Sequence, residues 1–306
     1  MKGTRTAARL NRIASLASLC LACVLIGIKL WAWIATGSVA MLTSAIDAIV
    51  DAGAAIATFA GVRYAAKPAD RDHRFGHGKA EALAAFVQAM FLAGAAVVLV
   101  FQSVERLINP EPLVNLGLGF WIIIGSTIAA AGLVAMQSWV TRRTASTAIA
   151  ADKAHYLTDI AVNLAVLAAF AVTALTGWVS ADPAFALGIS LYMLWNVKSI
   201  TQHALRQLLD RELSTQDRHR IRDAVLATSG VHALHDLRTR DAGDRVFVEF
   251  HLEVDGNLTV THGHAVSEAA EAVVAALFPG GADTVVHIEP AGIKDSRLDA
   301  MVGGRA

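Results

Sequence analysis

Two short segments of the chain place metal-ligating side chains four residues apart. Asp47 and Asp51 form one pair, and His155 and Asp159 form the other. Residues four apart on a helix project from one face, so each pair offers two ligand atoms on the same side. Three carboxylates and one imidazole suit the tetrahedral coordination of zinc better than the coordination of magnesium or calcium. The spacing predicts a transition-metal site, and the alternative is a buried polar network that only joins two helices.

Both pairs lie in an unusually apolar chain. Of its 306 residues, 55% are hydrophobic and 17% are charged, and the mean hydropathy is +0.50. This composition excludes an ordinary soluble domain and predicts a multi-pass membrane protein. The 26 basic and 26 acidic residues cancel, so no net charge attracts nucleic acid. Cys20 and Cys23 stand in one apolar run, which excludes a disulfide scaffold and a cysteine-rich zinc finger.

Six apolar runs have the roughly 20 residues that a helix needs to cross a bilayer. They are Ile13–Thr36, Val39–Val62, Ala82–Leu107, Leu113–Val140, Ser146–Thr176 and Ala181–Ile200. Lysine and arginine are concentrated before the first run and after the second and fourth, which predicts that both termini are cytoplasmic. The expected location is the inner (plasma) membrane.

The second and fifth runs cross the membrane in opposite directions. At about 1.5 Å of rise per residue, Asp47 comes level with Asp159, and Asp51 comes level with His155. An uncompensated aspartate near the bilayer centre costs about 2.5 to 3.5 kcal/mol, so three of them favour a functional site over accident.

Beyond about Arg206 the apolar runs shorten and charged residues return, which predicts a small soluble domain. Helical and alternating patterns predict an α+β domain of order αββαβ, a metallochaperone-like fold with two helices on one face of a three-stranded sheet. The expected elements are Thr215–Thr228, His235–Arg240, Arg245–Val254, Thr261–Phe278 and Thr284–Glu289. The chain divides into an all-α membrane domain over residues 1–208, a cytoplasmic metal-binding and dimerisation domain over 209–292, and a mobile tail over 293–306.

Two further groups of side chains could bind metal. In the loop after the second run, Asp70, His73 and His77 are close enough in sequence to bind one ion, with Asp72 as an alternative carboxylate and a solvated charged loop as the simpler interpretation. The soluble domain has its own candidates, namely His235, His251, His264, His287 and Glu289. His262 is an additional histidine, and a surface imidazole remains the alternative for any one of them.

Five motifs together give the chain its resemblance to a known family: DAIVD at 47–51, PADRDHRFGHGKAE at 68–81, HYLTD at 155–159, LLDREL at 208–213 and HDLRTR at 235–240. It resembles the cation diffusion facilitator family, in its bacterial zinc and ferrous-iron exporter branch, over nearly its whole length. The resemblance implies a homodimeric antiporter that exports divalent metal against inward proton flow. It implies that the four intramembrane residues form the transport site, that the loop holds an interfacial site, and that the cytoplasmic histidines hold two ions bridged by a carboxylate. Glu289 stands where close relatives have aspartate, which leaves one or two ions possible.

The predicted function is proton-coupled export of zinc, with cadmium and ferrous iron as further substrates. The expected partners are a second copy of the chain, divalent metal, protons and lipid, with zinc as both cargo and regulatory ion. An exporter selective for ferrous iron and a membrane-anchored metal sensor are the alternatives. An intramembrane metallohydrolase would need an open metal position and usually an H-E-x-x-H motif, which the sequence lacks, so no enzyme is expected.

Overall fold

The chain forms two compact units, residues 6–205 and residues 1–5 with 206–306. The computed structural model describes residues 2–36, 39–109, 117–178, 180–243, 245–278, 280–292 and 298. Nearly all of the tail predicted to be mobile, residues 293–306, lies outside the described residues.

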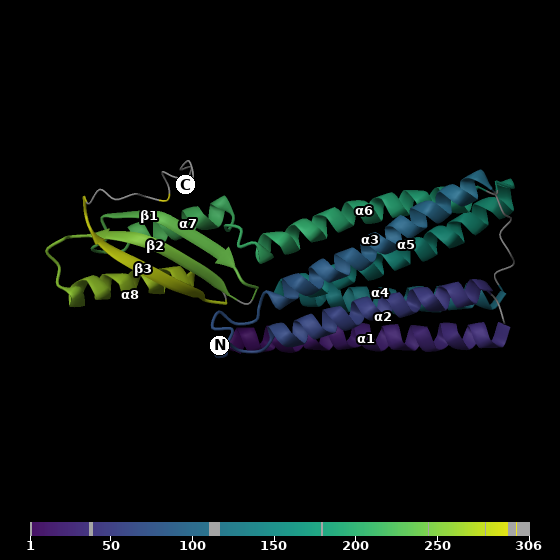
Figure 1. Ribbon diagram of the computed structural model, residues 1–306, viewed down its shortest axis with the longest axis horizontal. Helices are drawn as coiled ribbons and strands as arrows, with labels where there is room; N and C mark the ends of the chain where they lie inside the picture. Colours follow the sequence, from purple (N-terminus) through teal and green to yellow (C-terminus); the bar gives the residue numbers. More distant parts are fainter. Residues whose placement is uncertain are drawn as a thin grey trace. The chain divides into compact units, whose positions relative to one another are not determined.

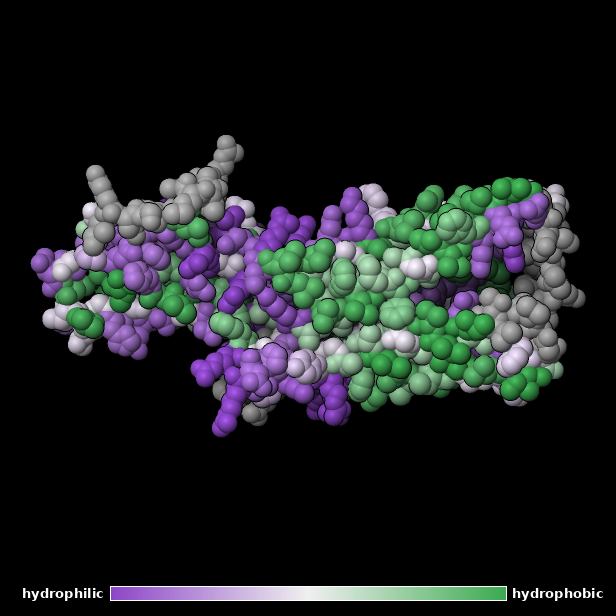
Figure 2. All heavy atoms as spheres, viewed as in Figure 1, coloured by the Kyte–Doolittle hydropathy of each residue, from purple (hydrophilic) through white to green (hydrophobic). Residues whose placement is uncertain are grey.

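Six long helices make up the first unit (Figure 1). They are α1 (Lys2–Thr36), α2 (Val39–Ala65), α3 (Ala80–Ile108), α4 (Gly117–Thr144), α5 (Thr147–Thr176) and α6 (Ala181–Leu208). The helix α1 begins at Lys2, so it extends beyond the predicted apolar run and includes the basic segment before it. Hydrophobic residues cover most of the visible surface of these helices (Figure 2), as expected for side chains in contact with lipid.

Within the described residues, five of these helices are long and apolar enough to cross a membrane: Thr6–Ala35, Ser44–Ala65, Ala80–Ile108, Phe120–Thr144 and Thr147–Thr173. The sixth helix, α6, has sufficient length at 28 residues but is less apolar. Its Asp182, Asn196 and Lys198 interrupt the apolar run. The prediction of apolar spans is confirmed for five helices, and the crossing of the sixth stays a prediction.

Small side chains allow the membrane helices to approach one another closely. Ala14, Ala84 and Ala148 belong to one buried contact group that also contains Val62, Val140 and Ile149, and Ala22, Ala52 and Ala55 form another. At Gly61 on α2, an added Cβ would overlap the Cβ of Ala84 on α3 and lie 3.0 Å from the carbonyl oxygen of Ala80. The glycine permits this helix crossing.

Local capping explains where α5 begins and ends. The side chain of Ser146 accepts a hydrogen bond from the backbone N–H of Ile149, which satisfies one free donor of the first turn. At the other end, Gly177 adopts a left-handed conformation with φ 73°, and its N–H bonds to the carbonyl of Thr173. The helix therefore carries His155 and Asp159 as a continuous scaffold without a break.

The second unit confirms the predicted αββαβ order. Its elements are α7 (Thr215–Leu226), β1 (Ala233–Asp241), β2 (Val246–Val254), α8 (Val260–Ala276) and β3 (Ala282–Pro290). The sheet order is β1-β2-β3, with β1 antiparallel and β3 parallel to β2. The parallel pair requires the crossover that α8 provides.

Both helices of this unit cover the same face of the sheet. Ile221 and Val225 from α7 and Val274 from α8 pack with the even-numbered residues of β2, such as Phe250 and Leu252. Because side chains alternate along a strand, the odd-numbered residues of β2 project from the opposite face. This second face, which α7 and α8 do not cover, is called the open face below.

Candidate metal sites

The intramembrane residues form a compact group where α2 and α5 cross. His155 Nε2 lies 3.2 Å from Asp51 Oδ1 and 3.7 Å from Asp159 Oδ2. One ligand atom from each of the three residues lies within 4.8 Å of the other two. The His155 side chain is 5% exposed, whereas the two carboxylates are about one-third exposed, at 33% and 36%. Two carboxylates and an imidazole converge here from two helices, which is a ligand set that can hold a divalent transition metal.

Asp47 stands apart from this group. It lies one turn before Asp51 on α2, is exposed, and does not contribute to the ligand group of the other three. Four residues correspond to a rise of about 6 Å, so the two aspartates reach different levels of α5. The structure thus brings together three of the four predicted residues, and participation of the fourth stays a prediction.

A buried carboxylate that sequence reasoning missed lies on the same face of α5. Asp152 has no exposed surface, and its Oδ2 accepts a hydrogen bond of 2.7 Å from Gln137 Nε2 on α4. Further along, Asn163 donates to Thr127 on α4 over 3.0 Å. Steps of three and four residues connect Asp152, His155, Asp159 and Asn163 into one polar stripe. That spacing was the available signal for Asp152.

The loop between α2 and α3 folds its three predicted residues together. Asp70 Oδ1 lies 3.4 Å from His73 Nδ1, and Asp70 Oδ2 lies 3.3 Å from His77 Nε2. His77 is buried, and the Tyr64 ring meets its ring edge-on at 4.7 Å between centroids. Three side chains that can bind a metal ion therefore face one another in a loop of 14 residues between Ala65 and Ala80. Asp72, the alternative carboxylate, is exposed and lies outside this group.

Backbone hydrogen bonds hold the Asp70 carboxylate in place. Its Oδ1 accepts from the N–H of His73 at 2.7 Å and from the N–H of Asp72 at 3.0 Å. The bond from His73, followed by smaller contributions that include the N–H of Asp72, holds the pKa of the Asp70 carboxyl below its usual range. The group therefore stays ionised as pH falls, and an ionised carboxylate is the form that binds metal.

The open face of the sheet collects the cytoplasmic histidines in one row. His235, His251 and His287 are direct cross-strand partners on β1, β2 and β3. Glu289, two residues beyond His287, lies 2.7 Å from His251 Nδ1, 3.4 Å from His235 Nε2 and 3.4 Å from His287 Nε2. One carboxylate thus contacts all three imidazoles, as a group that bridges or completes a metal site would.

His264 does not join this row in the single chain. It is exposed in the first turns of α8, the helix on the opposite face, and lies 3.4 Å from Glu268. His262 is also near the start of α8, where its N–H donates to Thr259, the residue that caps the helix. Of the five predicted cytoplasmic residues, the structure brings together four.

His235, His251, His287 and Glu289 form the open-face cluster. Two further acidic residues lie beside it that were not predicted from the sequence. Glu253 Oε1 lies 3.4 Å from His235 Nδ1, and strand alternation from His251 was enough to place Glu253 on the same face. Asp236 offers a ligand atom within 4.8 Å of His235 and His251. Alternation would have put Asp236 on the face opposite to His235, so no simple periodic signal could have found it.

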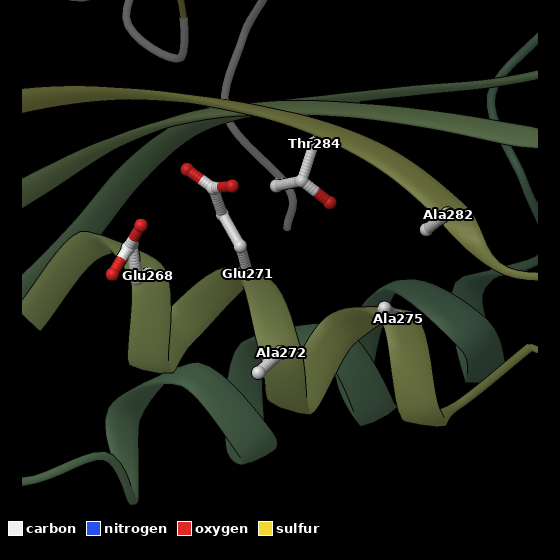
Figure 3. Close-up of a pocket in the computed structure, with 6 residues that line it drawn as sticks. All are labelled: Glu268, Glu271, Ala272, Ala275, Ala282 and Thr284. Atoms are coloured by element: carbon white, nitrogen blue, oxygen red, sulfur yellow. The ribbon is translucent and has the colours of Figure 1, made fainter.

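An open hollow between α8 and β3 contains none of these ligands. Figure 3 shows Glu268 and Glu271 projecting from α8 toward the strand that carries Thr284. Glu271 accepts a hydrogen bond of 3.2 Å from Ser267. The hollow is therefore on the helical side of the sheet, away from the open-face cluster.

Comparisons with known proteins place this geometry in a family. Residues 15–209 match the cation efflux transmembrane domain, and residues 213–291 match the cytoplasmic domain of cation efflux proteins. Over 285 residues the chain is 40% identical to the cation-efflux pump FieF of Escherichia fergusonii, with 93% of this chain and 94% of the relative covered. FieF of Shigella boydii serotype 18 matches to the same extent, with 40% identity and the same shares of each chain. A solved structure of CzrB in its zinc form covers 28% of this chain and 99% of that chain, with 34% identity and a TM-score of 0.26. The two domain matches and the full-length relatives show that this multi-pass membrane protein is a transporter of the cation diffusion facilitator family.

Proposed function

We propose that the chain exports zinc from the cytoplasm in exchange for protons, and that the ion passes through the group formed by Asp51, His155 and Asp159. One observation carries this proposal: three metal-ligating atoms from two membrane-spanning helices lie within 4.8 Å of one another. Family membership supplies the class, a cation efflux pump for divalent metal. The ligand set supports zinc, because a borderline ion accepts mixed imidazole and carboxylate ligands in tetrahedral geometry.

Asp47 is the fourth ligand in this proposal. It faces the same side of α2 as Asp51, so a small rotation or shift of α2 against α5 would bring its carboxylate toward the ion. Such a shift is part of any transport cycle in which a site opens alternately to the two sides of the membrane. Three carboxylates and one imidazole would then enclose the cargo.

Metal and protons compete for the same side chains. Carboxylates and imidazole bind metal only when deprotonated, so arrival of protons from the outer side releases the ion and arrival of metal releases protons. His155 is the central proton carrier because imidazole exchanges its proton within the physiological pH range, and because its Nε2 faces both Asp51 and Asp159. Because metal and protons cannot occupy these side chains at the same time, the protein exchanges one for the other.

The orientation and assembly of the protein are part of the same proposal. Basic residues at the start of α1, in the loop after α2 and at the end of α4 support a location in the inner membrane with both termini in the cytoplasm. The match to the cation efflux cytoplasmic domain supports a homodimer, with the predicted cytoplasmic domain, residues 209–292, as the dimerisation and metal-binding domain.

Zinc is also proposed as a resident regulatory ion at the cytoplasmic cluster and at the Asp70 loop. The residues fit such an ion: both ring nitrogens of His235 are buried without a hydrogen-bond partner in the described chain, and Glu289 faces three imidazoles. His235, His251, His287 and Glu289 would hold zinc on the open face, and Asp70, His73 and His77 would hold it in the loop. Bound zinc would tie the three strands together. His264, exposed on α8, would have to bind from outside this row.

Ferrous iron is the second candidate cargo. Imidazole and carboxylate ligands accept ferrous iron as well as zinc, so the same group favours both over manganese, which prefers oxygen-rich octahedral sites. A membrane-anchored sensor would use the cytoplasmic cluster but would leave the buried His155 and its two carboxylate neighbours without a role.

Metal flux across sealed proteoliposomes separates these functions. Purified protein is reconstituted, zinc is added outside, and a fluorescent zinc indicator inside reports entry with and without an imposed pH gradient. An antiporter moves zinc in the direction opposite to the proton gradient, and collapse of the gradient with an ionophore should slow it. Zinc flux that is indifferent to the gradient would contradict proton coupling, and the absence of any divalent-metal flux would favour the sensor. Repeating the assay with ferrous iron under reducing conditions ranks the two cargoes.

A further inference from the structure

The pairing between β1 and β2 contains an irregularity at the cytoplasmic cluster. His235 pairs with His251, and the next pair is Arg238 with Glu249. Three steps along β1 therefore correspond to two steps along β2, which is the pattern of a β-bulge with one extra residue. Within this segment Asp236 has φ 53°, in the left-handed region that most residues with a side chain avoid.

The bulge changes which face each residue of β1 occupies. Leu234 and Leu237 are three residues apart, yet both pack against the core on the helical side of the sheet. Between them, His235 and Asp236 are both buried and offer ligand atoms to the same group on the open face. In a regular strand Asp236 would point toward the apolar core, so the extra residue is what gives it the same face as its neighbour.

Two sets of ligands result, and they share one histidine. His235, Asp236 and His251 form the first set, with ligand atoms within 4.8 Å of one another. His251, His287 and Glu289 form the second set under the same limit. Each set contains two imidazoles and one carboxylate, a composition found at three-ligand zinc sites that take water or another group as the fourth ligand.

We propose that Asp236 is a metal ligand on the open face, beside His235 and His251, and that the β-bulge aims its carboxylate at the ion held there. The inference rests on the proposed function, in which the cytoplasmic cluster holds regulatory zinc. It adds one ligand to that cluster. Strained backbone at a buried polar residue is a recurrent feature of ligand sites, where surrounding structure holds the conformation in place. Aspartate also tolerates the left-handed region better than most residues, so the carboxylate can be kept there.

The test compares full-length protein with three variants in detergent solution. Asp236→Asn keeps the shape and the tolerance for positive φ but removes the charge. Asp236→Gly relieves the backbone conformation and removes the ligand altogether. Asp283→Asn makes the same chemical change on exposed β3, outside both ligand sets, and serves as the control. Zinc per chain is measured by equilibrium dialysis, and thermal unfolding is followed with and without zinc.

The expected result is a loss of one zinc ion per chain in Asp236→Asn and Asp236→Gly relative to wild type and Asp283→Asn. Without zinc, Asp236→Gly should unfold at the same temperature as wild type or higher, and its rise in unfolding temperature on zinc addition should be smaller. Cobalt(II) used as a coloured probe should lose part of its visible absorption in the same two variants. A purely structural Asp236 would give the opposite pattern: a lower unfolding temperature in metal-free Asp236→Asn, with full zinc stoichiometry.

Outcomes for this inference and for the proposed function are distinct. Unchanged zinc stoichiometry in Asp236→Asn and Asp236→Gly overturns the ligand role of Asp236 alone. Equal zinc stoichiometry in wild type and in a His251→Ala and His287→Ala double variant overturns the cytoplasmic site, and the inference with it. Absence of zinc flux in proteoliposomes with cytoplasmic binding intact overturns export and leaves Asp236 as a ligand of a metal sensor.

Discussion

His235 Nδ1 lies 3.4 Å from Glu253 Oε1, and both side chains are almost completely buried on the open face of the sheet. The other ring nitrogen, Nε2, lies 3.4 Å from Glu289 Oε2. One histidine therefore stands between two carboxylates. A metal-ligating histidine commonly donates its second N–H to a carboxylate, which selects the tautomer and orients the ring.

Replacing Glu253 should weaken zinc binding without removing a ligand. Glu253→Ala is expected to lower zinc affinity of the cytoplasmic cluster about 10- to 100-fold, the usual cost of losing such a partner. Glu253→Gln should lose less, because its amide oxygen keeps an acceptor beside His235 Nδ1. Chelator competition measures the affinity. Glu249→Gln, on the same face of β2 but 3.1 Å from Arg238, is the matched control, and an equal loss in that variant would argue against orientation of His235.

Asp51→Ala should abolish zinc transport while the protein remains folded. Asp51 Oδ1 lies 3.2 Å from His155 Nε2, so its loss removes a ligand and leaves an open side in the group. Loss of a residue that only orients a metal ligand lowers metal affinity or activity about 10- to 100-fold. Loss of a direct ligand should therefore lower the zinc flux by more than about 100-fold. Initial zinc flux in proteoliposomes measures this, with elution volume as the control for folding. Flux within twofold of wild type would remove Asp51 from the pathway.

His155→Asp should change which metal is transported. The substitution replaces the imidazole of the group with a carboxylate and yields an all-oxygen ligand set, which manganese accepts more readily than the mixed set. Wild type should carry zinc and cadmium well and manganese poorly, and the variant should carry manganese at a larger fraction of its zinc rate. Competition between metals in proteoliposomes gives both ratios. An unaltered order of preference would show that selectivity resides outside this group.

The Asp70 turn should respond to pH in one direction. Because backbone N–H groups hold the pKa of the Asp70 carboxyl below its unfolded value of about 3.9, the ionised carboxylate stabilises the folded turn above that value. The stabilisation is lost as pH falls through the lower, folded pKa. Slow amide exchange at His73 should therefore persist from neutral pH to about pH 4 and fade below it in metal-free protein. Asp70→Asn should remove this pH dependence, and Asp72→Asn should keep it. If the pH dependence persists in Asp70→Asn, the Asp70 carboxylate is not its cause.

Gly61→Ala should destabilise the helical unit although alanine favours helices. The new Cβ would overlap Ala84, so α2 and α3 must separate, at a cost of about 1 to 3 kcal/mol. Gly94→Ala on α3 meets nothing within 4 Å and should instead be neutral or stabilise by up to about 1 kcal/mol. Thermal unfolding in detergent compares the pair. A higher unfolding temperature for Gly61→Ala than for Gly94→Ala would mean that this crossing is not tightly packed.

The two kinds of periodicity account for how far prediction from the sequence could go. The helical repeat placed Asp51 and His155 on facing sides of α2 and α5, because a long helix keeps one phase from end to end. Strand alternation placed His251, His287 and Glu289 on one face for the same reason. Asp236 could not be found this way, since a bulge reverses the alternation and depends on pairing with β2.

Other differences arise from packing and composition. Whether Asp47 reaches its neighbours depends on the rotation of α2 against α5 by a fraction of a turn, which sequence spacing does not determine. The basic start of α1 continues the helix because Lys and Arg are good helix formers, although they do not belong to an apolar run. α6 is the reverse case, a long helix whose polar residues weaken the hydropathy signal.

The alanine-rich contacts among the membrane helices have a mechanical consequence. In one such group α2 contributes only Ala52 and Ala55, which meet Ala22, Leu19 and Ile26 of α1. A helix that presents only small side chains at a contact can slide or tilt by a fraction of a turn without forcing its own side chains into new rotamers. The core of the second unit is built differently, from large side chains such as Phe250, Leu252 and Val274. Close packing of these side chains should prevent its helices from sliding over the sheet. Deformation of this protein should therefore be concentrated in the helices that carry the ion, while the sheet and helices of the second unit keep their packing.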